Sequence, residues 1–174
     1  TTATITPRVL SVVYSGVNKV YDGNNTATVT TTDDRLGSDV LTVLRTATYS
    51  DKNVAYLNGA VTYKTISVAG VSLTGADATN YSVATTGNTT ATITPRALNV
   101  AYTGDTLIYN GSTVATVSTT DDRVLGDVFD IVRTASFADK NVGSNKAVSV
   151  SGVSLSNPSG VNTVDASNYT VVST

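Results

Sequence analysis

The chain has 174 residues and a net charge of −2, and its sequence contains no His, Cys, Met, Trp, Glu or Gln. These gaps exclude disulfides, thiolate chemistry, His-ligated metals and a Ser-His-Asp triad. The slight acidic balance argues against nucleic-acid binding, and no apolar run approaches the roughly 18 residues of a membrane span.

An internal duplication organises the whole chain. The segment Thr1–Arg8 returns 88 positions later as Thr89–Arg96, and 31 of the 54 residues in 1–54 are identical to their counterparts in 89–142 without a gap. A period of this length indicates two tandem domains rather than a solenoid of small units.

Beta-branched residues fall in short alternating runs along the chain, and no segment has the apolar spacing of an amphipathic helix. The sequence therefore predicts an all-β fold. The first strand is expected over Arg8–Tyr14, where alternate residues are unchanged in the second repeat, which indicates one buried face. The core residues predicted from this face are Leu10, Val12, Tyr14, Leu98, Val100 and Tyr102.

The tripeptide Tyr21-Asp22-Gly23 becomes Tyr109-Asn110-Gly111 in the second repeat. Asp and Asn both favour turns, but Asn has no acid–base function. We therefore interpret this tripeptide as a turn and not as a catalytic site.

Clustered carboxylates follow the turn. Asp33-Asp34-Arg35 and Asp39 recur in the second repeat as Asp121-Asp122-Arg123 and Asp127. Ca²⁺ takes six to eight oxygen ligands, and neither an EF-hand loop nor a bidentate Glu is present. We interpret these residues as turn formers and ion-pair partners, with Arg45 and Arg133 as candidate partners, and we assign no metal site.

A second strand is expected over Val40–Tyr49, with its counterpart over Val128–Phe137. Arg45 interrupts an otherwise apolar face of this strand, so either a bulge turns it outward or it is partly buried against a carboxylate. Further strands are predicted at Thr26–Thr30, Ala60–Val68, Asn80–Thr85 and Thr89–Thr94.

The sequence Asp51-Lys-Asn-Val54 is repeated unchanged as Asp139-Lys-Asn-Val142. Lys, Asn and an acid are the components of an intramolecular isopeptide bond, but neighbours in a strand point to opposite faces. A polar turn is the favoured interpretation.

The segment Tyr81–Ile93 is interpreted as a hairpin, because Gly87-Asn88 supplies tight-turn residues between two alternating runs. Thr89–Thr94 would then close the first domain. Pro95 would mark a short, stiff junction, because Pro cannot donate a ladder hydrogen bond and restricts the preceding residue.

These boundaries define repeat 1 as residues 1–94 and repeat 2 as residues 95–174. On this interpretation residues 1–7 are the closing strand of a preceding repeat, and the second domain lacks a closing strand. In the alternative assignment, Thr-Thr-Ala-Thr-Ile-Thr opens each domain.

An ordered set of motifs runs through the first repeat, and most of it returns in the second. The motifs are Ile5–Arg8, Lys19–Gly23, Gly37, Asp39, Ala47–Val54, Ser67–Leu73 and Gly75–Tyr81. This set resembles the YDG-type, mostly-beta glycine repeats of large bacterial surface adhesins of the filamentous-haemagglutinin type. The resemblance implies a secreted stalk of a two-partner secretion system, with roles in cell adhesion and biofilms, and it transfers no catalytic or binding residues.

We therefore expect an all-β chain of two homologous, elongated domains, sandwich-like or β-grasp-like, placed end to end. The expected function is a stalk or spacer at the bacterial cell surface, in which each copy adds about 30–40 Å of reach. The chain is expected to be a monomer without enzymatic activity, cofactor or membrane insertion. Its expected partners are neighbouring repeats, and glycans or a host surface through other regions.

Two alternative functions remain. Exposed Tyr49, Tyr56 and Tyr63 are candidates for stacking on sugars, which would make the first repeat a carbohydrate- or receptor-binding module. A Ca²⁺-stiffened linker is the other alternative, because carboxylates recur in both repeats.

Overall fold

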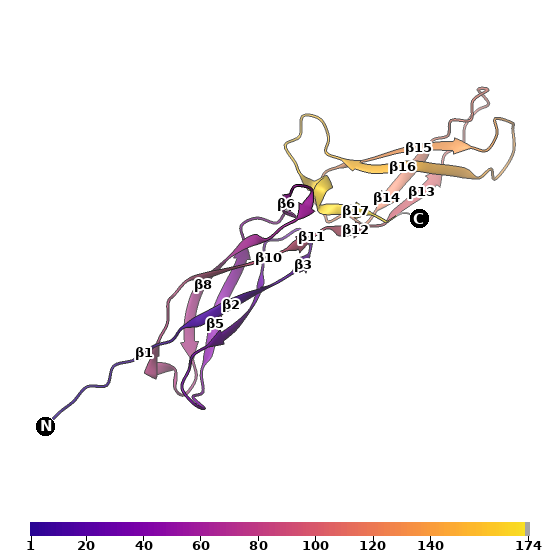
Figure 1. Ribbon diagram of the computed structural model, residues 1–174. Coiled ribbons are helices and arrows are strands. Elements are labelled where there is room, and N and C mark those ends of the chain that lie inside the picture. The colour runs from indigo at the N-terminus through magenta and orange to yellow at the C-terminus, as the bar shows by residue number, and fades with distance from the viewer. Residues whose placement is uncertain (173–174) are drawn as a thin grey trace. The chain divides into compact units, whose positions relative to one another are not determined.

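A computed structural model of the protein describes residues 1–172. The chain divides into two compact units, Thr1–Thr94 and the part from Pro95 onward. Each unit is built from β-strands with one short 3₁₀ turn, which confirms the all-β class and the two homologous domains (Figure 1). No helix in the described part is long and apolar enough to cross a membrane.

The first unit is organised around one long strand, β8, which is the centre of an antiparallel sheet in the order β10-β8-β5. Strands β2 and β4 form an antiparallel pair, β1 pairs with β9 and β3 with β11 in parallel, and β6 and β7 form a hairpin. The elements are β1 Arg8–Val9, β2 Val12–Val17, β3 Lys19–Val20, β4 Thr28–Asp33, β5 Thr42–Tyr49, β6 Tyr56–Leu57, β7 Ala60–Val61, β8 Lys64–Thr74, η1 Ala78–Asn80, β9 Tyr81–Ser82, β10 Gly87–Ala91 and β11 Ile93–Thr94.

The described residues of the second unit repeat part of this arrangement, as three pairs of strands. The antiparallel pairs are β13 with β14 and β15 with β16, and β12 pairs with β17 in parallel. The elements are β12 Arg96–Leu98, β13 Val100–Gly104, β14 Val117–Asp121, β15 Asp130–Phe137, β16 Val148–Ser156, η2 Asp165–Asn168 and β17 Tyr169–Val171.

Alternation of buried and exposed side chains makes β5 and β8 the core strands of the first unit. Ile66 and Val68 on β8 are 0% and 1% exposed, and Val43 and Tyr49 lie on the buried face of β5. The predicted strand over Val40–Tyr49 and its counterpart are confirmed within two residues at each end. Apolar residues at every second position pack against the opposite sheet, while Thr and Ser face solvent.

The first predicted strand is confirmed in part. A break at residues 10–11 separates β1 from β2, and β2 then alternates between half-buried and exposed residues. Leu10, Leu98 and Val100 are buried, whereas Val12, Tyr14 and Tyr102 are only half-buried.

A bulge on β8 lies opposite Arg45, but the arginine is half-buried and is not turned outward as one of the two alternatives required. Gly70 and Val71 together oppose the single residue Arg45, because the register shifts between Leu44 and Thr46. Gly70 has a φ of 61°, a left-handed conformation that suits Gly at the first position of such a bulge. Gly152 opposes Arg133 in the same way with a φ of 63°.

The predicted hairpin over Tyr81–Ile93 is wrong. Gly87 and Asn88 belong to β10, which pairs with β8 from Gly87 opposite Val68 to Ala91 opposite Lys64. Gly87 is required here for space rather than for a turn, because a Cβ atom would lie 2.4 Å from Cε2 of Tyr14. Glycine inside a strand often marks such a close approach.

The segment before β1 forms no strand. Residues 1–7 are exposed throughout, and Ile5 is 99% exposed. Its repeat, Thr89–Thr94, contributes to β10 and β11 and so pairs with strands of the first unit.

Candidate functional site

The residues kept in both repeats form local networks inside each unit. The turn at Asp22 is one of them: its carboxylate accepts hydrogen bonds from the backbone N–H of Asn24 at 3.1 Å and from Nζ of Lys19 at 2.7 Å. Burial raises the pKa of Asp22, but these hydrogen bonds outweigh it and the pKa is lowered overall. Tyr21 is buried and Gly23 has a φ of 81°.

The second repeat makes the same turn with an amide in place of the acid. Oδ1 of Asn110 accepts a hydrogen bond from the backbone N–H of Ser112 at 2.9 Å, and Gly111 has a φ of 76°. The turn interpretation is thus confirmed, since the bond that Asp22 and Asn110 share needs only an acceptor oxygen.

Asp33 and Arg35 form a bidentate ion pair two residues apart. Nε of Arg35 lies 2.7 Å from Oδ1 of Asp33, and its second terminal nitrogen lies 2.6 Å from Oδ2. The remaining guanidinium nitrogen donates to the carbonyl of Leu41 at 2.6 Å, so the pair ties the end of β4 to the start of β5. The hydrogen bonds from Arg35 lower the pKa of Asp33 below its ordinary value.

The second unit has the same pair. Arg123 binds Asp121 at 2.8 and 2.7 Å and donates to the carbonyl of Phe129 at 2.8 Å. The carboxylates of this cluster therefore do pair with arginine, but not with Arg45 or Arg133 as the sequence suggested.

Arg45 and Arg133 are held by carbonyls instead. Arg45 donates to the carbonyls of Val43 and Val29, and Arg133 donates to those of Ile131 and Val117. Arg45 thus links β5 to β4, and Arg133 links β15 to β14 in the same way. A carbonyl oxygen has two lone pairs and can accept a second hydrogen bond from such a side chain.

The neighbouring carboxylates are occupied by donors of the protein. Asp34 accepts from the backbone N–H of Ser11 at 2.8 Å and from Arg8 at 3.2 Å, and Asp122 accepts twice from Asn99, at 2.9 and 2.7 Å. Within residues 1–172 no group of three or more potential ligand side chains is arranged around a metal position.

A tyrosine clamp was not foreseen from the sequence. The hydroxyl of Tyr81 donates to Asp39 at 2.6 Å and accepts from the backbone N–H of Leu36 at 2.8 Å, and its bond to Asp39 raises the pKa of Tyr81. Tyr169 and Asp127 repeat the contact at 2.7 Å. In the first unit the clamp holds the loop before β5 against β9. In the second unit it holds the loop before β15 against β17. The sequence did contain a sign of this contact, because the Asp and the Tyr are both unchanged between the two repeats.

A buried lysine was also missed. Lys64 is 7% exposed, and its Nζ contacts the Asp51 carboxylate at 2.5 Å and the Asn53 carbonyl at 2.8 Å. Nζ of Lys52 lies 5.7 Å from the centre of the Tyr21 ring. Residues 51–53 form a bend, as the polar-turn interpretation predicted, and the lysine that joins them comes from β8.

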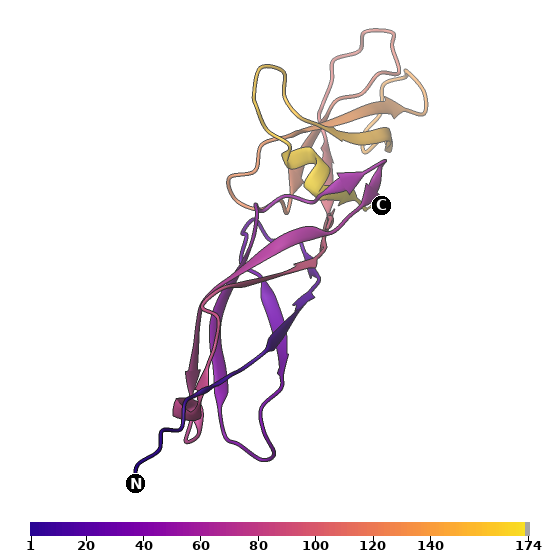
Figure 2. The same ribbon diagram turned by 60° about the vertical axis from the view of Figure 1, so that its left-hand side comes forward.

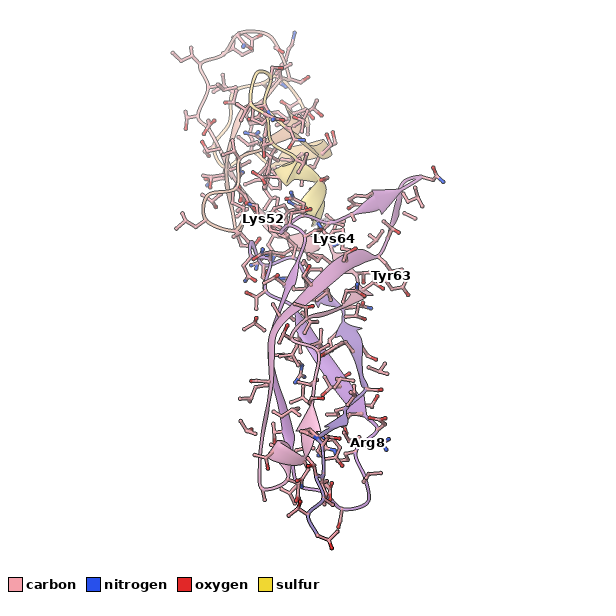
Figure 3. All side chains as sticks on the ribbon, turned by 90° about the vertical axis from the view of Figure 1, so that its left-hand side faces the viewer. Arg8, Lys52, Tyr63 and Lys64 are labelled. Atoms are coloured by element: carbon pink, nitrogen blue, oxygen red, sulfur yellow. The ribbon has the colours of Figure 1, made fainter. Side chains whose placement is uncertain are left out.

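The three tyrosines proposed to stack on sugars do not share one environment. Tyr49 is only 2% exposed and its hydroxyl donates to the Val17 carbonyl at 3.1 Å, so its predicted exposure is wrong. Tyr56 and Tyr63 are 43% and 69% exposed, and both lie in or beside the β6–β7 hairpin (Figure 3). The hairpin turns on Asn58-Gly59, both with positive φ, which is a favoured two-residue turn.

A comparison with family models matches the YDG domain twice, at residues 6–91 and 94–174. The chain belongs to the YDG domain family. The two matches cover nearly the whole sequence, and the Tyr21 and Tyr109 turns lie one in each YDG domain. Searches of curated proteins and of solved structures find no match.

Proposed function

We propose that the two YDG domains are structural spacers, stalk repeats of an extracellular bacterial adhesin that hold a distal binding region away from the cell surface. One observation supports this proposal above all: the residues that both repeats retain make contacts inside their own unit. The Asp33–Arg35 pair, the Tyr81–Asp39 clamp and the Arg45 bulge all brace strands within the first unit, and the second unit repeats each of them. Residues retained for internal bracing are typical of a chain selected for cohesion.

The junction supports the same role. β11 ends at Thr94 and β12 begins at Arg96, so Pro95 alone separates the last strand of one unit from the first strand of the next. Proline fixes its own φ and restricts the preceding residue. A spacer gains reach from such short connections, whereas a long flexible linker would coil.

The remaining parts of the proposal follow from this role. The chain acts without catalysis or cofactor, its main partners are neighbouring repeats, and it works outside the cell. The many exposed Thr and Ser side chains, such as Thr30 and Ser67, suit a solvated outer surface.

Surface display tests the spacer function. One, two and three copies of the chain are inserted between a membrane anchor and a small binding tag, and the height of the tag above the membrane is measured by interference microscopy. Equal increments per copy are expected. The control replaces each copy with a Gly/Ser linker of the same number of residues, for which height grows with about the square root of length. Increments no larger than those of the linker would contradict the proposal.

The β6–β7 hairpin supports a second candidate function, glycan binding by the first domain. Tyr56, Leu57 and Tyr63 are 43%, 64% and 69% exposed, and such surface aromatic residues can stack on sugar rings. In the described residues 138–147, the shorter β15–β16 connection of the second repeat forms no such hairpin. A glycan array with the wild-type chain and the Tyr56→Ala and Tyr63→Ala variants tests this function. Specific binding that both variants lose would support it, and the absence of any specific signal would remove it.

A further inference from the structure

Three positions in the sequence place Asp or Asn directly before Gly. They are Asp22-Gly23, Asn58-Gly59 and Asn110-Gly111, and the glycines have φ values of 81°, 82° and 76°. At an Asn-Gly sequence the backbone nitrogen of Gly can attack the side-chain carbonyl carbon of Asn, because glycine has no side chain to block the approach. Each of these turns is therefore a candidate for a reaction between a side chain and the backbone.

Side-chain hydrogen bonds hold two of the three turns. Oδ1 of Asn110 accepts from the backbone N–H of Ser112 at 2.9 Å, and Oδ1 of Asp22 accepts from that of Asn24 at 3.1 Å. Asn110 must break its hydrogen bond before its Cγ can turn toward the backbone. Asp22 also binds Nζ of Lys19 at 2.7 Å, and its lowered pKa keeps the carboxylate ionised at neutral pH, which makes it a poor target for a nucleophile.

The turn at Asn58-Gly59 is closed by the backbone instead. Leu57 pairs with Ala60 across β6 and β7, so these two residues alone form the loop. Asn58 has a φ of 52° and Gly59 has a φ of 82°, as a tight two-residue hairpin loop requires. Within residues 1–172, the Asn58 side chain has no hydrogen-bond partner. Its amide group can therefore reorient without breaking a bond to the protein.

The hairpin is also short and open to solvent. Figure 2 shows it as two short strands that leave the body of the first unit. Asn58 and Gly59 are both exposed, and no atom lies within 4 Å of the position that a Cβ atom on Gly59 would take. β6 and β7 have 2 residues each, and so short a ladder opens readily. Opening lets the backbone of Asn58 rotate until the nitrogen of Gly59 reaches Cγ.

We propose that Asn58 is a deamidation site, at which the side chain reacts with the backbone without an enzyme. The backbone nitrogen of Gly59 loses its proton to a base in the solvent and bonds to Cγ of Asn58. The bond from Cγ to Nδ2 then breaks, and the amide nitrogen takes up a proton and leaves as ammonia. The resulting succinimide ring is opened by one water molecule at either carbonyl, which gives aspartate or isoaspartate at this position. Water is the only co-reactant.

The two products have different effects on the hairpin. Aspartate has the same backbone as Asn and tolerates the same left-handed conformation, so the two-residue loop should persist. Isoaspartate carries the chain through its side-chain carbon and lengthens the loop by one backbone atom. The pair of Leu57 with Ala60 then cannot keep its register, because loop length fixes the register of a hairpin.

The site does not depend on the spacer function, because the reaction requires only the hairpin and water. It does affect the candidate glycan site, since Tyr56 and Leu57 form β6. Either product adds a negative charge to the hairpin, and the isoaspartate form would also displace these two side chains.

Peptide mapping by mass spectrometry tests the site. The whole folded chain is incubated in buffers of increasing pH, and the deamidated fraction is measured at Asn58 and at Asn110 over time. Asn58 should react about tenfold faster, which is the effect of the one hydrogen bond that Asn110 has to break. Both rates should rise with pH, because the attacking nitrogen must lose its proton.

Denaturation supplies the matched control. In guanidinium chloride both sites lie in an unfolded chain and both are followed by Gly, so their rates should become nearly equal. Asn58→Gln should remove the reaction at this position, because the longer side chain would have to close a larger ring. Loss of the mass change in this variant assigns the reaction to position 58.

Hydrogen exchange tests the effect on the hairpin. The backbone N–H of Thr62 donates to the Ala55 carbonyl at 2.9 Å. Reacted chains are separated by ion exchange through their added charge, and they should contain a fraction in which the Thr62 amide exchanges faster than in wild type. Asn58→Asp carries the same charge without the extra backbone atom, and it should keep the wild-type protection of Thr62.

Three results would overturn the proposal. One is an Asn58 that stays intact in the folded chain while the denatured chain reacts. Another is an Asn58 that reacts no faster than Asn110 in the folded chain, which would mean that the geometry of the turn does not select the site. The third concerns the hairpin: equally fast exchange of Thr62 in Asn58→Asp would assign the opening to the charge and not to isoaspartate.

Discussion

Individual side chains in this protein act mainly as braces between strands that are close in space. The Asp33–Arg35 pair is an example in which two residues close along the chain bind one another directly. Its three donated hydrogen bonds link the carboxylate, the guanidinium and the carbonyl of Leu41 at 2.6–2.7 Å. Bidentate pairs of this kind combine charge with a fixed geometry.

Asp33→Asn should lower the stability of the first unit by about 2 kcal/mol at pH 7, because it removes the charge from an acceptor whose side chain is only 5% exposed. The lowered pKa of Asp33 means that this stabilisation is complete above the unfolded-state pKa of about 3.9. It is lost as the pH falls through the lower, folded-state pKa.

Thermal unfolding of the whole chain between pH 7 and pH 2 checks this expectation. The difference between wild type and Asp33→Asn should shrink as the pH drops below about 4. Asp130→Asn, an exposed residue of β15, is the control and should stay within about 0.5 kcal/mol of wild type. A difference that is constant across the pH range would show that the charge of Asp33 is not what stabilises the fold.

Strands in the first unit depend on glycines for two distinct reasons. Gly70 supplies a left-handed conformation at the β8 bulge, whereas Gly16 and Gly87 supply space for a neighbouring strand or ring. Substitution by Ala separates the two roles, because a methyl group clashes with neighbouring atoms at Gly16 and Gly87 but not at Gly70.

Gly70→Ala should destabilise the first unit by about 1–2 kcal/mol, the cost of a left-handed conformation for a residue with a Cβ atom. No atom lies within 4 Å of the new methyl group, so no packing term adds to this cost. Gly70→Asn should cost less, because Asn tolerates this conformation. Denaturant unfolding measures both, and equal stability of all three chains would remove the conformational argument.

Gly16→Ala and Gly104→Ala form a matched pair across the two units. The first variant places a methyl group 2.6 Å from the Thr90 carbonyl oxygen, while the second meets nothing closer than 3.5 Å. Overpacking costs typically about 1–3 kcal/mol, so Gly16→Ala should be destabilising and Gly104→Ala nearly neutral. Differential scanning calorimetry at low concentration distinguishes them. Equal destabilisation would contradict this expectation, because it would mean that Gly104 has no more space beside it than Gly16.

At the scale of the whole molecule, two separate cores imply two separate unfolding events. The division at Thr94 and Pro95 places Ile93 in the first unit, where it is fully buried, and leaves its repeat Ile5 outside every strand.

Ile93→Ala should therefore destabilise the first unit by about 2–5 kcal/mol, through lost burial and the cavity left behind. The second unit should be unaffected, because Ile93 is buried in the first unit and the second unit has its own buried residues. Hydrogen exchange read out by residue would show faster opening in residues 8–94 alone. Ile5→Ala is the control and should change neither unit, because Ile5 is 99% exposed. Faster exchange in both units would indicate a single cooperative core.

The sequence by itself determined the duplication, the all-β class, the burial of Leu10 and the turn at Asp22. These features depend on alternation and on backbone preferences of residues close along the chain, so they are readable without a structure. Comparison of the two repeats added to this. The change from Asp22 to Asn110, for example, shows that the turn requires an acceptor oxygen and not a charge.

Only the tertiary structure decided which distant groups meet. β10 pairs with β8 rather than folding back on β9, Tyr49 is buried rather than exposed, and Lys64 reaches Asp51 from a strand away. Each outcome depends on which strand edge is unpaired and on how closely two backbones approach, as at Gly16 and Gly87. Such choices are made between segments far apart in sequence, where local propensity carries no information.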